Sequence, residues 1–138
     1  MARVVVIEDD DRVREMIEAV LSRSGHAVST HADASSGMSR LEDELASGSE
    51  RLVVITDIFM PDRDGLELTA EIKRLHPDVR VIAISGGGEY GDVSYLATAR
   101  AFGADITLPK PFRPAELRAA VNEIAPRPTG GDDGTLSR

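Results

Sequence analysis

Short apolar runs alternate with amphipathic segments along most of the chain. Five runs, most of them rich in β-branched residues, predict strands at residues 4–7, 27–30, 52–55, 79–84 and 104–108. The intervening segments have helical period. The clearest stripe has apolar residues at i, i+3, i+4, i+7 and i+8: Val13, Met16, Ile17, Val20 and Leu21.

Boundary residues agree with these predicted helices. Gly25 is placed to end the first helix, His76-Pro77 ends a later one, and Pro114 stands at the first position of the last. Arg113 occupies the apparent N-cap of that last helix, where Ser or Asp is preferred. This costs about 0.5 to 2 kcal/mol unless another group caps the helix. The other helical segments are marked by Met38, Leu41 and Leu45, by Leu68, Ile72 and Leu75, and by the alanine-rich stretch 90–102.

Strands and helices that alternate in this way predict an α/β fold. We expect a doubly wound, five-stranded parallel sheet with right-handed crossovers and helices on both faces. Residues 1–125 form one domain in this interpretation. From Pro126 the composition shifts to Pro, Thr, Gly and Asp, which predicts a flexible C-terminal tail over residues 126–138.

Composition narrows the class of protein. The 138 residues are 41% hydrophobic and 29% charged, which is typical of one soluble globular domain. A net charge of -8 argues against direct DNA binding. The chain has no cysteine, so disulfides and thiolate metal sites are excluded and a reducing compartment fits. Its first apolar run is too short for a signal peptide or a membrane span, so we expect a cytoplasmic protein without membrane insertion.

Polar residues that could bind a ligand or take part in a reaction follow four of the predicted strands. The strand ends carry Glu8-Asp9-Asp10, Asp57, Ser85 and Lys110. A single acid after a strand often only caps the next helix. Ligands of such sheets bind beyond the carboxyl ends of the strands, however, and here acids, a hydroxyl and an amine converge on that edge. The joint arrangement predicts a functional site.

Three grouped carboxylates favour a bound cation, because their mutual repulsion otherwise raises the cost of ionisation. A few oxygen ligands and waters suit Mg2+, whereas the calcium-loop pattern is reproduced only in part by residues 62–65. Lys110 and Ser85 offer a positive charge and a hydroxyl to phosphoryl oxygens. Asp57 ends the central strand and is the candidate nucleophile for phosphoryl transfer. No G-x-x-x-x-G-K-[ST] loop is present, so ATP is not the expected donor.

Over about residues 3–125, this pattern resembles the response-regulator receiver domain of two-component signalling. The residues that carry the resemblance are Glu8-Asp9, Asp57 with Met60-Pro61 and Asp64-Gly65 after it, Ser85, and Lys110-Pro111-Phe112. The resemblance implies the flavodoxin/CheY-like sheet order 2-1-3-4-5. It also implies a cis bond between Lys110 and Pro111, which is uncommon even before proline.

The resemblance implies a role for each residue of the site. The implied roles are phosphoacceptor for Asp57, switch hydroxyl for Ser85, phosphoryl partner for Lys110, and Mg2+ ligands for Glu8, Asp9, Asp57 and the backbone carbonyl of Phe59, with Asp9 as the direct ligand of the acidic pair. The implied partners are a histidine kinase or histidine phosphotransfer protein as donor and a downstream protein as target. Such a domain catalyses only its own phosphorylation and dephosphorylation.

Two departures from the family pattern change the expected switch. Thr107 stands where many relatives carry an aromatic residue in strand five, and three glycines, residues 86–88, follow Ser85. We therefore expect residues 86–95 to reorganise on phosphorylation in place of an aromatic rotation. Phe59 and Gly87 flank the acceptor and are candidates for setting the lifetime of the phosphoryl group.

Two other functions use part of the same pattern. A haloacid-dehalogenase-like phosphatase also uses an Asp nucleophile and Mg2+, but Asp57-Ile58-Phe59 lacks the second acid of its D-x-D motif, and no cap domain is evident. An interaction module that is never phosphorylated would need only the surfaces of the fold. The retained Asp57, Ser85 and Lys110 argue against that module.

Overall fold

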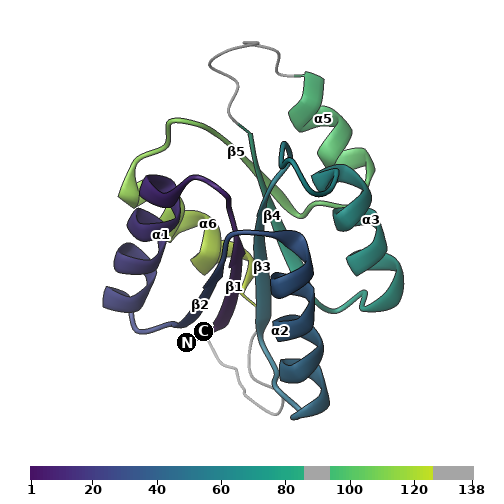
Figure 1. Cartoon of the computed structure of the whole chain (residues 1–138). Coiled ribbons are helices and arrows are strands. Elements are labelled where there is room, and N and C mark those ends of the chain that lie inside the picture. The colour runs from purple at the N-terminus through teal and green to yellow at the C-terminus, as the bar shows by residue number, and fades with distance from the viewer. Residues whose placement is uncertain (86–93, 126–138) are drawn as a thin grey trace, which may run out of the picture.

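The chain folds into a five-stranded parallel sheet between two layers of helices, in a computed structural model that describes residues 1–85 and 94–125 (Figure 1). The strand order is β2-β1-β3-β4-β5, so the predicted fold class and order are confirmed. The elements are β1 (Arg3–Ile7), α1 (Asp11–Arg23), β2 (Ala27–His31), α2 (Ala34–Ala46), β3 (Leu52–Asp57), α3 (Gly65–Leu75), β4 (Arg80–Ser85), α5 (Ser94–Ala101), β5 (Ile106–Pro109) and α6 (Pro114–Ile124).

Strand residues alternate between two cores. Val4 and Val6 of β1 pack in the core that α1 and α6 cover, whereas Val5 and Ile7 pack in the core beneath α2 and α3. Ala99 of α5 packs in a smaller third cluster. All six residues of β3 are buried, as expected for the central strand of a sheet covered on both faces. Because all the strand pairs are parallel, the carboxyl ends of the strands share one edge of the sheet, where Asp9 is exposed.

The last strand begins later than the sequence pattern predicts. Ala104 and Asp105 belong to the turn before β5, because the Ala104 amide donates to the carbonyl of Ala99 and the Asp105 amide donates to that of Val81. β5 therefore starts at Ile106. Residues 86–93, with the three glycines and the start of the predicted 90–102 helix, and the predicted tail 126–138 lie outside the described residues.

The helix ends follow the expected local chemistry. Gly25 has φ +91° directly beyond α1, and Pro114 opens α6. The weak cap expected at Arg113 is compensated from inside the helix, since the Arg113 amide donates to Glu116 Oε1 at 2.7 Å. Among the described helices, none has the length and apolar character needed to cross a membrane.

Candidate functional site

Adjacent strands bring three carboxylates together at the open edge of the sheet. Ile7 of β1 pairs with Thr56 of β3, so the next residues, Glu8 and Asp57, lie side by side. One carboxylate oxygen from each of Glu8, Asp9 and Asp57 lies within 4.8 Å of the others. Glu8 and Asp57 are buried, whereas Asp9 is exposed. The site therefore has a buried floor and one ligand that faces solvent.

Lys110 lies between two of these acids. Its Nζ is 2.8 Å from Glu8 Oε1 and 3.2 Å from Asp57 Oδ2. The lysine follows β5 and precedes a cis bond to Pro111, and its amide donates to the carbonyl of Ser85 at 2.7 Å. The short segment after β5 is thus bonded to the end of β4, which places the amine over the end of β3.

Burial sets the electrostatics of this cluster. Burial raises the pKa of Glu8 to about 7, because desolvation disfavours the ionised carboxylate. The hydrogen bond with Lys110 lowers the pKa, but by less than burial raises it. The negative charge of Asp57 raises it further. For Lys110, burial lowers the pKa, but the ion pairs with Glu8 and Asp57 outweigh it, so the net pKa is raised. The amine therefore stays protonated near neutral pH and compensates the acids.

Ser85 and Phe59 both lie close to Asp57. Asp57 pairs with Ile84 across β3 and β4, so the buried Ser85 ends the neighbouring strand one residue further along. The Phe59 amide donates to Asp57 Oδ1 at 3.2 Å, and the Phe59 ring is 40% exposed. Thr107 of β5 pairs with Ala83 of β4.

Three other acids near this edge serve helix ends. Asp10 Oδ1 accepts the amides of Arg12 and Val13 at the start of α1. Asp64 caps α3 in the same way. Asp62 Oδ2 accepts the amide of Ala34 at the start of α2, 28 residues away in the chain. Residues 62–65, which imitate part of a calcium loop, therefore contain two acids that cap helices.

Two contacts near the site were not predicted from the sequence. Arg14 Nη1 donates to the backbone carbonyl of Glu8 at 2.9 Å, and the same guanidinium pairs with Asp11. An arginine in the first turns of a helix that follows an acidic strand end is a signal that could have revealed it. No local signal marks the bond from Asp62 to Ala34, because it joins two separate loops.

The acidic cluster fits a hard divalent cation. Its donors are carboxylate oxygens, the set that Mg2+ prefers. Glu8 Oε1 is buried and, within the described part of the chain, makes no hydrogen bond besides its ion-pair contact with Lys110. No histidine belongs to a metal-type cluster among residues 1–85 and 94–125. These carboxylates could hold a divalent ion at the solvent-facing side that Asp9 occupies.

The fold and the site together define a class of protein. It is a doubly wound α/β domain in which an acidic cluster that could hold a cation lies beside a lysine, at the carboxyl ends of the strands. Comparison with known families identifies the member of that class. The sequence pattern of the response regulator receiver domain matches residues 4–122. The chain therefore belongs to the receiver domain family of two-component response regulators.

Relatives with different architectures share this domain. The chain is 35% identical over 123 residues to the sensor kinase CckA of Brucella abortus (strain 2308), covering 89% of this chain and 12% of that protein. It is 32% identical over 124 residues to the response regulator receiver protein CpdR of the same strain, covering 90% of this chain and 94% of CpdR. A receiver domain protein from Clostridium thermocellum has a TM-score of 0.77 and 30% identity, covering 91% and 94% of the two chains.

The share of each relative that is covered differs widely. The chain spans 12% of CckA, and it spans 23% of the DNA-binding transcriptional regulator NtrC of Azospirillum brasilense, to which it is 37% identical. The receiver domain is therefore a part of those proteins, whereas it is nearly the whole of CpdR.

Proposed function

We propose that Asp57 accepts a phosphoryl group from a phosphohistidine donor in a Mg2+-dependent reaction. One observation carries this proposal: the Asp57 carboxylate lies 3.2 Å from the Lys110 amine and within 4.8 Å of the Glu8 and Asp9 carboxylates. A carboxylate nucleophile, a fixed cation and an acidic cation site are the groups that phosphoryl transfer to aspartate requires.

Each residue has a defined part in the proposed transfer. A carboxylate oxygen of Asp57 forms the new bond to phosphorus, the bond from phosphorus to the donor imidazole nitrogen breaks, and the imidazole keeps that electron pair. Lys110 pairs with phosphoryl oxygens, and the Ser85 hydroxyl donates to another of them. The ion pairs with Glu8 and Asp57 hold the Lys110 amine beside the acceptor before the reaction begins, so little reorganisation of the lysine is needed.

Mg2+ is the proposed cofactor, since receiver domains generally bind it at an acidic pocket. Asp9, Asp57, Glu8 and the Phe59 carbonyl would hold it. When bound, it supplies positive charge to the phosphoryl oxygens.

The proposed partners are a histidine kinase or histidine phosphotransfer protein as donor and a downstream protein as target. The coverage of CpdR supports a single-domain regulator that acts through protein contacts or a phosphorelay. We also propose that the protein is cytoplasmic, binds no DNA directly and is not an enzyme for other substrates, consistent with its net charge of -8.

Intact mass after incubation with Mg2+ and phosphoramidate tests this function. The wild type should gain the mass of one phosphoryl group, and D57N should gain none. D78N removes an exposed acid between α3 and β4 and should behave as the wild type. Repeated turnover of small phosphate esters would instead identify a phosphatase of the haloacid-dehalogenase type, and a wild type that gains no mass would identify a phosphorylation-independent module.

A further inference from the structure

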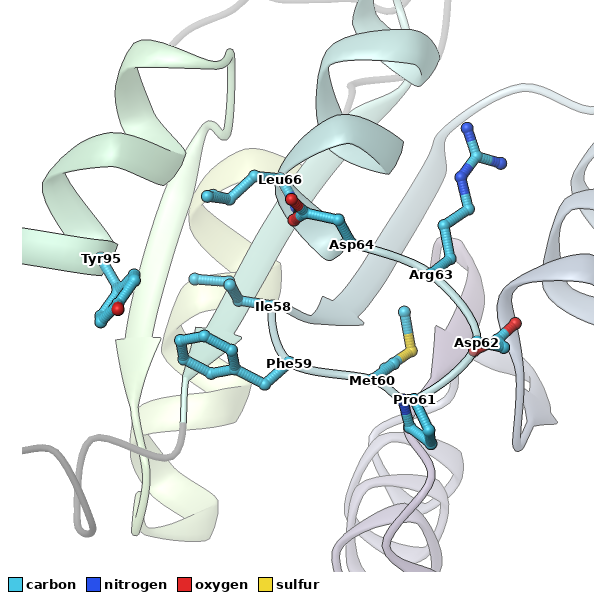
Figure 2. Close-up of a pocket in the computed structure, with 9 residues that line it drawn as sticks. All are labelled: Ile58, Phe59, Met60, Pro61, Asp62, Arg63, Asp64, Leu66 and Tyr95. Carbon is cyan, nitrogen blue, oxygen red and sulfur yellow. The ribbon is translucent and has the colours of Figure 1, made fainter.

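A groove of about 570 Å³ lies along the loop that follows β3, which begins directly after Asp57 (Figure 2). It follows that loop from Ile58 to Asp64 and extends to Tyr95 of α5. Its apolar lining includes Phe59, Met60 and Leu66. The volume is within the range of protein sites that bind a ligand side chain or a small molecule.

Two aromatic rings form one end of the groove. The rings of Phe59 and Tyr95 meet edge to face, with centroids 4.8 Å apart and an interplanar angle of 80°. Figure 2 shows the Phe59 side chain directed toward Tyr95. Phe59 nevertheless stays 40% exposed, and Met60 beside it has a side chain that adapts to different apolar partners. This end of the groove can therefore receive an apolar side chain without prior unfolding of the loop.

Hydrogen bonds hold the loop in place from both ends. Asp62 accepts the amide of Ala34 on α2, and the Gly65 amide donates to the carbonyl of Ile58 at 2.9 Å. Phe59 and Asp64 also form an antiparallel bridge across the loop. A groove that is formed before binding avoids most of the cost of ordering a loop on association.

Charged side chains along the loop select the partner. Arg63 pairs with Glu71 of α3, so its charge is matched, whereas Asp62 and Asp64 are exposed and leave the lining of the groove negative. A positive side chain complements these two carboxylates, and the net charge of -8 favours the approach of a basic partner. A second copy of this acidic chain is disfavoured for the same reason.

We propose that the groove docks an extended segment of a partner protein, with an aliphatic or aromatic side chain against Phe59 and Tyr95 and a Lys or Arg beside Asp62 and Asp64. The groove is also coupled to the acceptor, because the Phe59 amide donates to Asp57 Oδ1. This coupling rests on the proposed function. Reciprocity requires that, if phosphorylation changes the affinity for the segment, the bound segment changes the free energy of phosphorylation equally.

A display selection tests the docking: a random heptapeptide library is selected for binding to the full chain. We expect enriched peptides that combine an apolar residue with Lys or Arg, and chemical-shift changes of the wild type on titration with a synthetic enriched peptide should centre on residues 58–66 and Tyr95. Acidic enriched peptides, shift changes centred on another face, or no enrichment at all would overturn the proposal.

Matched variants locate the peptide by residue. F59A and Y95A should each weaken the peptide about tenfold, since aromatic contacts and their buried area are lost. F102A removes a phenylalanine of nearly equal exposure, 41%, that follows the end of α5 and does not line the groove, and it should leave affinity unchanged. D62N keeps an oxygen for the Ala34 amide and should weaken binding through charge alone, while D78N should not. Equal effects of F59A and F102A, or of D62N and D78N, would contradict the proposed site.

The coupling has its own measurement. The Kd of the same peptide is measured for protein with and without phosphoramidate treatment, with intact mass as the record of phosphorylation. We expect at least about a fivefold change, the lower end of measured allosteric couplings. If no phosphoryl mass is gained, the proposed function fails while the peptide result stands. If the mass is gained and Kd is unchanged, the coupling is wrong.

Discussion

Glu8 should make the stability of the metal-free protein fall as pH rises, and E8Q should remove that effect. The side chain is fully buried, and burial raises its pKa from 4.5 to about 7 even though the hydrogen bond with Lys110 lowers it. A raised folded pKa means that the protonated form is favoured by folding. The contribution of protonated Glu8 to the free energy of unfolding is complete below pH 4.5 and is lost as pH rises toward 7.

The size of the effect follows from the two pKa values. Linkage gives an unfavourable contribution of ionised Glu8 of about 1 kcal/mol at about pH 5.5 and about 3 kcal/mol at about pH 8. Gln has the same shape and no charge to titrate. The free energy of unfolding of E8Q, minus that of the wild type, should therefore increase by about 2 kcal/mol across this interval.

Urea unfolding followed by circular dichroism, with EDTA present, measures this difference at each pH. E44Q is the matched control, because the hydrogen bond from Ser49, together with Arg40 and Arg3, lowers the pKa of Glu44. The contribution of Glu44 is lost only as pH falls below 4.5, so its difference from the wild type should stay flat over the same interval. A flat result for E8Q as well would refute the reasoning, since Glu8 would then have the same pKa folded and unfolded.

Three further predictions concern neighbouring parts of the fold. G65A should lower the free energy of unfolding by about 1 to 3 kcal/mol or more, measured by urea unfolding, because a Cβ at Gly65 would lie 2.2 Å from the backbone oxygen of Asp57. D105A should cost about 1 to 3 kcal/mol in the same assay, since Asp105 Oδ2 accepts from Lys73 Nζ and a strand amide; D105N should recover part of this. Mg2+ should raise Tm, with about 2.7 kcal/mol expected at one hundred times Kd, and D9N should reduce this rise; equal rises in both proteins would exclude Asp9 as a ligand.

Much of the fold was predictable because its signals are local. Periods of two and of 3.6 residues identify strands and helices within a single segment, and Gly25 and Pro114 mark helix boundaries through their own backbone preferences. The start of β5 was predicted two residues early, since apolar Ala104 continues the pattern while its amide bonds back to α5.

The sequence predicted which residues at the strand ends form the candidate site, but it did not predict the distances between them. Its residues are identifiable because each follows an apolar run, and parallel strands end at one edge. The distances from Lys110 to Glu8 and Asp57, and the raised pKa of Glu8, depend on register and burial that no single segment contains.

The sequence by itself determined the α/β class, helix boundaries such as those at Gly25 and Pro114, and the residue types at the open edge of the sheet, since these depend on interactions within a few residues. Only the tertiary structure decided that Asp62 accepts the Ala34 amide at the start of α2 and that Phe59 meets Tyr95. Both contacts join separate segments, and their geometry follows from how the loops pack. A pattern of apolar and polar residues predicts which face is buried, but it does not predict which side chains meet across a loop.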